Sequence, residues 1–175
     1  AYRKRIESLI TKNTRAIMIT NPGNPTGVVL SEEEMRMIAD IAKKHDLFLI
    51  CDEVYREFCY TDSGKIPCMG HFDDIADNLI IIDSVSKRFS SCGARIGCVI
   101  TKNKDLQKAL MKFCQSRLSV ATLDQIGSAA LYNVDENYMR ESIKEYRHRR
   151  DVCIVGLRAI PGVIVEEPKG AFYVM

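Results

Sequence analysis

Three short apolar runs, each followed by polar residues, most constrain how this 175-residue chain can fold. The runs span residues 16–19, 47–51 and 79–82, and a fourth strand-like run spans residues 96–100. The first three are apolar at every position, which is typical of strands buried in a parallel sheet that helices cover on both faces. The pattern therefore predicts an α/β fold with three layers (αβα) and a mostly parallel sheet.

The segment between the first two strands is predicted to be a helix. Ser31 can cap its first turn, and Glu34, three residues later, completes a capping box. Met35, Ile38 and Ile41 then recur at the spacing of one apolar helix face. Residues 16–51 are therefore predicted to form a βαβ unit.

Helical periodicity continues over residues 104–118, 123–132 and 135–159. The last of these segments is rich in charge and would be roughly 35 Å long at about 1.5 Å per residue. We expect it to connect two domains, and a solvated surface helix is the alternative. The chain starts inside a helical pattern, and residues 170–175 resemble a strand that is cut off, so we expect a piece of a longer protein.

Composition excludes several classes of function. The 25 basic and 23 acidic residues nearly cancel, which gives no electrostatic case for binding nucleic acid or an anionic membrane. No apolar run approaches the roughly 20 residues that span a bilayer, and no signal peptide opens the sequence. The seven cysteines include no CxxC pair, so we predict buried, reduced thiols in a cytoplasmic protein and no metal site.

The residues that follow the three predicted parallel strands carry the strongest functional signal. Asn24 follows the first strand, Asp52 and Tyr55 follow the second, and Lys87 follows the third. The carboxyl ends of parallel strands share one edge of a sheet, and ligands bind in the crevice there. The topology therefore predicts that these four side chains meet at one site.

The chemistry of these side chains suits an aldehyde cofactor with a pyridine ring. Lys87 would form a Schiff base with the aldehyde and then move a substrate proton. Asp52 would stabilise a proton on the ring nitrogen, which electron-sink chemistry requires. Asn24 and Tyr55 would donate hydrogen bonds to a phenolate oxygen on the ring.

An anion site is predicted beside the lysine. Ser84, Ser86 and Arg95 would bind a phosphate group, because a guanidinium matches its oxygens and hydroxyls donate to them. Each candidate has a plainer alternative: the serines and Asp52 can cap helices, Asn24 can be a turn residue, a tyrosine can be a core aromatic, and the arginine can pair with a surface acid. The joint placement of all these residues favours a site.

The chain resembles the class I/II aminotransferase family of fold-type I pyridoxal-phosphate-dependent enzymes. Residues 24–27 resemble the family's NPTG turn, and residues 52–55 resemble its D-x-x-Y strand end. Residues 84–97 resemble its lysine signature, and residues 168–173 resemble the motif that begins its small domain. The resemblance extends over nearly the whole sequence.

This resemblance implies a site, a cofactor and a domain plan. Lys87 would be the catalytic lysine and pyridoxal 5'-phosphate the cofactor. The cofactor-binding residues would be Asn24, Asp52, Tyr55, Ser84, Ser86, Lys87 and Arg95. Residues 1–134 would be the C-terminal half of the large domain, residues 135–160 an interdomain helix, and residues 161–175 the start of the small domain.

The implied reaction is the transfer of an amino group between an amino acid and a 2-oxo acid. Carbon–sulfur β-lyases use the same motifs, and a pyridoxal-phosphate-binding sensor domain of a transcription regulator has the same fold, so both are alternatives. The parent protein would be a homodimer. Nothing in the chain corresponds to the N-terminal half of the family's large domain, so we expect little or no transaminase activity from the chain alone.

Overall fold

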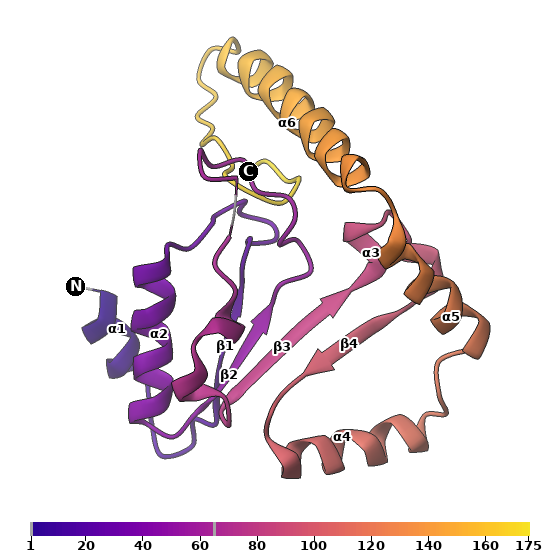
Figure 1. Ribbon diagram of the computed structural model, residues 1–175. Coiled ribbons are helices and arrows are strands. Elements are labelled where there is room, and N and C mark those ends of the chain that lie inside the picture. The colour runs from indigo at the N-terminus through magenta and orange to yellow at the C-terminus, as the bar shows by residue number, and fades with distance from the viewer. Residues whose placement is uncertain (1, 65) are drawn as a thin grey trace.

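The computed structural model describes residues 2–64 and 66–175 and contains a four-stranded sheet (Figure 1). The strands β1 (Ala16–Thr20), β2 (Phe48–Asp52), β3 (Leu79–Ser84) and β4 (Gly97–Ile100) lie in the order β1-β2-β3-β4. The first three are parallel, and β4 runs antiparallel to β3. The predicted α/β fold with a mostly parallel sheet is confirmed.

Helix α2 (Glu32–Lys44) connects β1 and β2 and completes the predicted βαβ unit. Its capping box is present, because Glu34 N donates to Ser31 Oγ at 3.2 Å and Ser31 N donates to Glu34 Oε2 at 2.9 Å. Such a cap stabilises a helix by about 1 kcal/mol. Helix α1 (Tyr2–Ser8) lies beside α2, and Lys44 Nζ pairs with Glu7 Oε1 at 2.7 Å.

The main core lies between one face of the sheet, α2 and two short 3-10 turns, η1 (Met69–His71) and η2 (Asp73–Ile75). Its buried residues are Met35, Ile38, Ala39, Ala42, Leu47, Leu49, Cys51, Met69, Ile75, Leu79 and Ile81. Ile17 and Ile19 of β1 pack against this cluster. The alternation along each strand thus sends every second side chain into the core.

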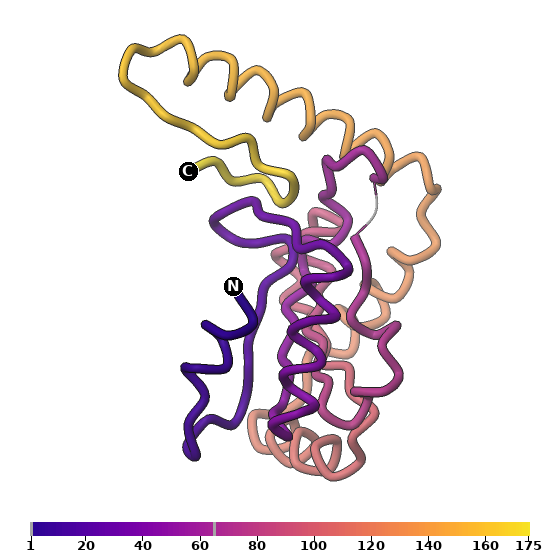
Figure 2. Tube along the Cα trace, turned by 90° about the vertical axis from the view of Figure 1, so that its left-hand side faces the viewer, coloured from indigo at the N-terminus to yellow at the C-terminus, as the bar shows by residue number. Residues whose placement is uncertain are grey.

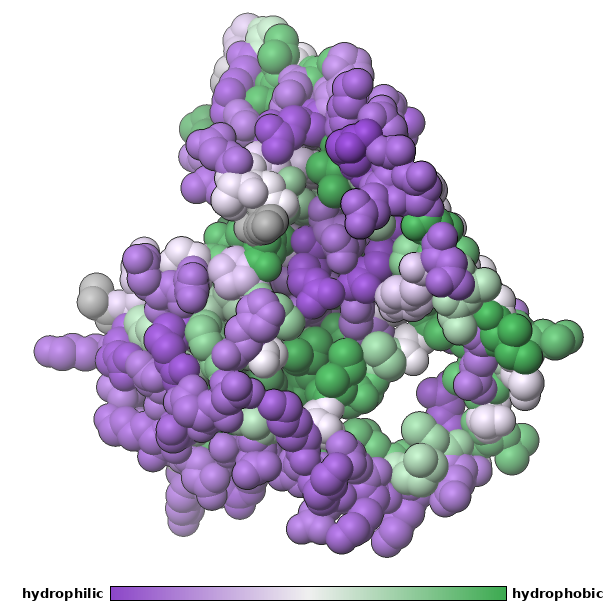
Figure 3. Space-filling model, in the orientation of Figure 1, coloured by the Kyte–Doolittle hydropathy of each residue, from purple (hydrophilic) through white to green (hydrophobic). Residues whose placement is uncertain are grey.

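The opposite face of the sheet is largely bare. Met18 of β1 is 63% exposed and Val99 of β4 is 47% exposed, and Ile50 lies in register with Met18 on the same face. Figure 3 views the molecule from the side of α2 and shows that apolar side chains are exposed on that side too, in the middle of the molecule beside an opening. Within the described residues, helices therefore cover one face only, and the third layer predicted from the sequence is absent.

The reason for the missing layer is the position of α4 (Lys104–Ser116) and α5 (Thr122–Ala130). Both helices lie beyond β4, at the edge of the sheet, and do not cross its bare face (Figure 1). They are followed by the 3-10 turn η4 (Leu131–Asn133) and the long helix α6 (Glu136–Arg158). The three helices predicted in this part of the chain are confirmed to within a few residues.

The C-terminal segment folds back between α6 and the loop that follows β1 (Figure 2). The strand predicted over residues 170–175 is wrong, because Gly170 makes only an isolated antiparallel bridge with Cys59. An apolar run becomes a strand only where a neighbouring segment offers a ladder of hydrogen bonds, and here the pairing ends after one residue. Residues 163–165 also lie outside any helix or strand.

A close approach at Gly27 anchors this C-terminal segment. Lys169 N and Gly170 N both donate to Gly27 O, at 2.9 Å and 3.0 Å. Gly27 has a φ of +67°, and a Cβ atom there would lie 2.3 Å from Pro168 Cβ. Glycine is therefore the residue that lets the turn adopt this conformation and the C-terminal segment dock.

The predicted burial of the thiols is only partly correct. All seven cysteines are free, but only Cys51 and Cys59 are buried. The exposed thiols are those of Cys92, Cys98, Cys114 and Cys153, and they lie on β4, on helices outside the core and on the turn before β4. Within the described residues, no helix is both long and apolar enough to cross a membrane.

Candidate active site

The parallel strands end at one edge of the sheet and bring the predicted residues together there. Asp52 lies in register between Thr20 of β1 and Ile82 of β3. Asn21 N donates to Asp52 O at 3.0 Å, so the loop after β1 starts beside the end of β2. Glu53 N donates to Ile82 O at 2.9 Å, which holds the end of β2 against β3 in the same way.

Asn24 and Tyr55 converge on the hydroxyl of Tyr173. Tyr55 is 3% exposed, and its hydroxyl forms a hydrogen bond with that of Tyr173. Asn24 Nδ2 donates to the same Tyr173 oxygen at 3.4 Å. The hydrogen bond with Tyr55 and burial raise the pKa of Tyr173 above its ordinary value. Two side chains from different strand ends are thus aimed at a single aromatic oxygen.

Lys87 lies on α3 (Val85–Arg88), the one-turn helix directly after β3. Its Nζ atom is 5.6 Å from the centre of the Tyr55 ring and 5.8 Å from the centre of the Phe172 ring. These distances are typical of cation–π contacts. Among the described residues, Lys87 Nζ has no ion pair and no hydrogen bond, so the amine is not committed to a carboxylate.

Asp52 is half-buried at the end of β2 and belongs to the bare face of the sheet. Its Oδ1 atom accepts a hydrogen bond from Val54 N at 3.2 Å. In the part of the chain that the structure describes, its carboxylate pairs with no arginine or lysine. It therefore offers a negative charge that a cationic ligand atom can use.

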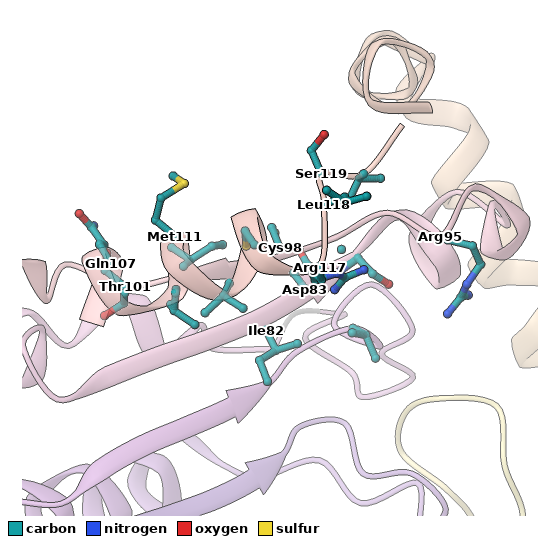
Figure 4. Close-up of a pocket in the computed structure, with 18 residues that line it drawn as sticks. Ile82, Asp83, Arg95, Cys98, Thr101, Gln107, Met111, Arg117, Leu118 and Ser119 are labelled. Atoms are coloured by element: carbon teal, nitrogen blue, oxygen red, sulfur yellow. Dashed lines mark hydrogen bonds between the residues drawn. The ribbon is translucent and has the colours of Figure 1, made fainter. Parts of the chain in front are cut away.

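The three residues predicted to bind a phosphate are in different situations. Ser84 caps α3, because Ser86 N donates to Ser84 Oγ at 3.3 Å. This is the helix-capping role that was the alternative to phosphate binding for Ser84. Arg95 is exposed, and its Nη1 atom donates to Cys92 O at 2.9 Å. Figure 4 shows Arg95 set apart from the other labelled residues.

Ser84 and Arg95 also line a cavity of about 850 Å³ between β4 and α4. The other lining residues include Ile82, Val99, Met111 and Leu118, so the cavity is mostly apolar. Lys87 instead contacts the aromatic rings of Tyr55 and Phe172. The structure thus links Asn24, Tyr55 and Lys87 through the rings of Tyr55 and Tyr173, and it places Arg95 with Ser84 at the cavity beside β4.

Comparison with known proteins identifies the family. Residues 2–175 match the family model described as "Aminotransferase class I and II". The chain belongs to this aminotransferase family. It is 35% identical over 167 residues to an aspartate aminotransferase of Pyrococcus horikoshii, and this match covers 94% of the chain and 42% of the relative.

Other members of the aminotransferase family show the same partial coverage. An aspartate aminotransferase of Bacillus subtilis is 32% identical, with 97% of the chain and 43% of the relative covered. The structure of an alanine aminotransferase from Pyrococcus furiosus superposes with a TM-score of 0.89 at 29% identity, over 98% of the chain and 44% of that structure. The chain therefore spans less than half the length of these relatives.

The aminotransferase family depends on pyridoxal phosphate, and the residues at the strand ends fit this group. Lys87 offers an uncommitted amine, and Asp52 offers a carboxylate without a cationic partner. Asn24 and Tyr55 already contact an aromatic hydroxyl, that of Tyr173, which has the same chemistry as the ring hydroxyl of the cofactor. The fit rests on donor and acceptor types that are present in the structure.

Sequence reasoning missed two residues of this candidate site, Tyr173 and Phe172. Both lie in the segment that was interpreted as a strand, and their role depends on a contact across 118 residues of sequence, between Tyr55 and Tyr173. The only available signal was the resemblance of residues 168–173 to a family motif. Glu53 was also missed. It is 3% exposed, and it holds the loop after β2 by accepting a hydrogen bond from Met69 N.

Proposed function

We propose that this chain is the lysine-bearing part of a pyridoxal-phosphate-dependent aminotransferase. The whole protein would transfer an amino group between an amino acid and a 2-oxo acid. The observation that carries the proposal is the grouping of Lys87 with Asn24 and Tyr55, in a chain that matches the family over nearly its full length. Because several relatives are named aspartate aminotransferases, aspartate is the first substrate to test.

Lys87 would have two roles in this reaction. Its deprotonated Nζ atom would hold the cofactor through a covalent bond to the aldehyde carbon, and the aldehyde oxygen would leave as water. After the substrate amine has taken over that bond, the freed Nζ would accept the proton from the substrate α-carbon and return it elsewhere. Bound pyridoxal phosphate would supply the electron sink for this proton transfer.

The neighbouring side chains would hold and tune the cofactor. The Asp52 carboxylate would keep the ring nitrogen protonated, because an adjacent negative charge favours the charged form. Asn24 and Tyr55 would donate hydrogen bonds to the ring oxygen. Ser84, Ser86 and Arg95 would bind the phosphate, and Arg95 would exchange its hydrogen bond with Cys92 O for one with the phosphate.

The proposal also assigns each segment of the chain to a domain of the parent protein. Residues 1–134 would be part of the large domain, residues 135–160 an interdomain helix, and residues 161–175 the start of the small domain. The bare face of the sheet would be covered by a part of the parent that this chain does not contain. The parent would be a homodimer, and the chain alone would have little or no transaminase activity.

The test is to trap the bond between Lys87 and the cofactor. The chain is incubated with pyridoxal phosphate, reduced with borohydride and analysed by peptide mass spectrometry. We expect the pyridoxyl group on Lys87 in the unchanged chain, none at that position in Lys87→Arg, and unchanged labelling of Lys87 in the control Lys102→Arg. Lys102 is a surface lysine paired with Asp73.

Labelling spread evenly over surface lysines would contradict the proposal. The same samples also test the expected inactivity of the chain. Aspartate-dependent turnover clearly above that of Lys87→Ala would show that the chain is catalytically complete, which contradicts its assignment as one part of an active site.

A further inference from the structure

The hydroxyl of Tyr173 occupies the centre of the hydrogen-bond arrangement at the strand ends. We propose that Tyr173 is a placeholder: in the cofactor-free chain its hydroxyl takes the position between Asn24 and Tyr55 that the ring oxygen of pyridoxal phosphate takes, and it leaves that position when the cofactor binds. This inference rests on the proposed function. It adds a residue that controls how readily the cofactor enters.

The first argument is chemical equivalence. The Asn24 amide nitrogen can only donate a hydrogen bond, so the group facing it must be an acceptor. The Tyr173 oxygen accepts this bond at 3.4 Å and is also bonded to the Tyr55 hydroxyl. The ring oxygen of the cofactor, a phenolate in the proposed function, can accept hydrogen bonds from the same two side chains. Both cannot occupy one position between the same two partners.

The second argument is that Tyr173 can leave without unfolding the segment that carries it. The backbone is anchored as far as Ala171, whose N–H donates to Phe58 O at 2.9 Å. Beyond Ala171, the described residues make no backbone hydrogen bond. Phe172 is held by its ring, which stacks on Tyr146 and meets Tyr55 edge-on at 5.1 Å.

The Tyr173 side chain is held less firmly than its neighbour. Both side chains are half-buried, but the Tyr173 ring meets only the rings of Tyr55, edge-on at 5.5 Å, and of Phe172 at 5.2 Å among the described residues. The Phe172 ring also contacts the rings of Phe58 and Tyr146. Its hydroxyl bonds are therefore a main part of what holds it at the site. Replacing those bonds with bonds to water is a small change in free energy, since an exchange of this kind is nearly balanced.

The test compares cofactor affinity in the 175-residue chain and in Tyr173→Phe. This substitution keeps the aromatic ring and removes only the competing hydroxyl. Because the hydrogen bonds of this hydroxyl with Asn24 and Tyr55 no longer have to be exchanged, we expect pyridoxal phosphate to bind about fivefold more tightly, as measured by an absorbance titration. The matched control is Tyr138→Phe, which removes a hydroxyl bonded to Ser90 at 3.3 Å outside the site, and we expect no change in its affinity.

A second probe makes the test specific to the ring oxygen. A pyridoxal phosphate analogue without the ring hydroxyl leaves the position between Asn24 and Tyr55 empty, so the Tyr173 hydroxyl can stay there. We therefore expect the analogue to bind the unchanged chain and Tyr173→Phe equally well. A gain with both ligands would overturn the placeholder role, because it would show that the substitution merely loosens the site.

Failure of this inference is distinguishable from failure of the proposed function. If borohydride traps the cofactor on Lys87 in both chains with equal affinity, the placeholder role is wrong and the proposed function stands. If Tyr173→Phe binds the cofactor more weakly, Tyr173 helps to hold it, and the placeholder role is again wrong. If Lys87 is labelled in neither chain, the proposed function fails and the inference fails with it.

Discussion

At the scale of single residues, the strand ends combine one carboxylate that serves the structure with another that is available for binding. Glu53 Oε1 accepts a hydrogen bond from Met69 N at 3.0 Å, and its Oε2 accepts one from Arg56 Nη1 at 3.2 Å. Asp52, the preceding residue, has only the local bond to Val54 N. Adjacent positions on a strand point to opposite faces, which explains why one acid is satisfied and the other is available.

The first residue-scale prediction concerns Glu53. Glu53→Ala leaves the buried N–H of Met69 without its acceptor and removes one of the partners of Arg56. Because an unsatisfied buried donor costs about 1–3 kcal/mol, we expect the free energy of unfolding to fall by about 2 kcal/mol in a denaturant titration.

The control is Glu166→Ala, at an exposed position. Surface substitutions of this kind change stability by no more than about 0.5 kcal/mol. Equal stabilities of the two variants would show that Glu53 does not hold the loop after β2.

At the scale of elements, a cluster of charges fastens η2 to α2. Arg36 of α2 pairs with Asp74 of η2 at 2.7 Å, and Lys43, two turns later, reaches the same carboxylate at 3.0 Å. These hydrogen bonds lower the pKa of Asp74 from 3.8 to about 2. The turn that closes the core beneath Phe72 is thus joined to the helix by charge as well as by apolar contact.

The pH dependence of this cluster gives the element-scale prediction. Asp74 binds protons less readily in the folded chain, so its stabilising effect is complete above the ordinary pKa of 3.8 and is lost as the pH falls through about 2. We expect Asp74→Asn to lower the Tm at neutral pH and to have little effect below about pH 2. Thermal unfolding followed by circular dichroism across this range measures the difference, with the exposed Asp62→Asn as control. A deficit that stays constant across the range would contradict the prediction.

The elements also show what local sequence determines and what it does not. The strand β1 and the capping box of α2 were predicted because apolar runs and the pair Ser31 and Glu34 act within a few residues. The strand predicted at residues 170–175 was wrong because a strand requires a partner at a distance along the sequence. Likewise, Tyr173 reaches Asn24 across 149 residues, and no local pattern encodes that contact.

At the scale of the whole molecule, the exposed apolar surface is unusual. Met18 on the bare sheet face is 63% exposed, Met111 on α4 is 58% exposed and Leu118 in the loop after α4 is 77% exposed. Soluble domains rarely leave such residues in contiguous patches unless another surface covers them. The fold of this chain is therefore well formed on one side of the sheet only.

This bare face gives the whole-molecule prediction. We expect the isolated chain to bind the dye ANS, which fluoresces on exposed apolar surface. Met18→Lys places a charge in the middle of that face and is expected to reduce the fluorescence about twofold or more, because charge disfavours apolar binding. The control Val152→Lys changes a residue of similar exposure, 60%, on α6. Equal reductions in both variants would show that the dye does not report on the sheet face.

The docking of the C-terminal segment on Gly27 also has a consequence for the order in which the molecule is assembled. During synthesis the N-terminal segments leave the ribosome first, so β1, α2 and β2 can associate while the rest of the chain is still being made. The contacts of Gly27 with Pro168 and Gly170, and of Tyr55 with Tyr173, must wait until residues 168–173 have been made. Until then Tyr55 lacks the aromatic cover of Phe172 and Tyr173. The surroundings of Lys87 are thus completed only after the sheet that positions it.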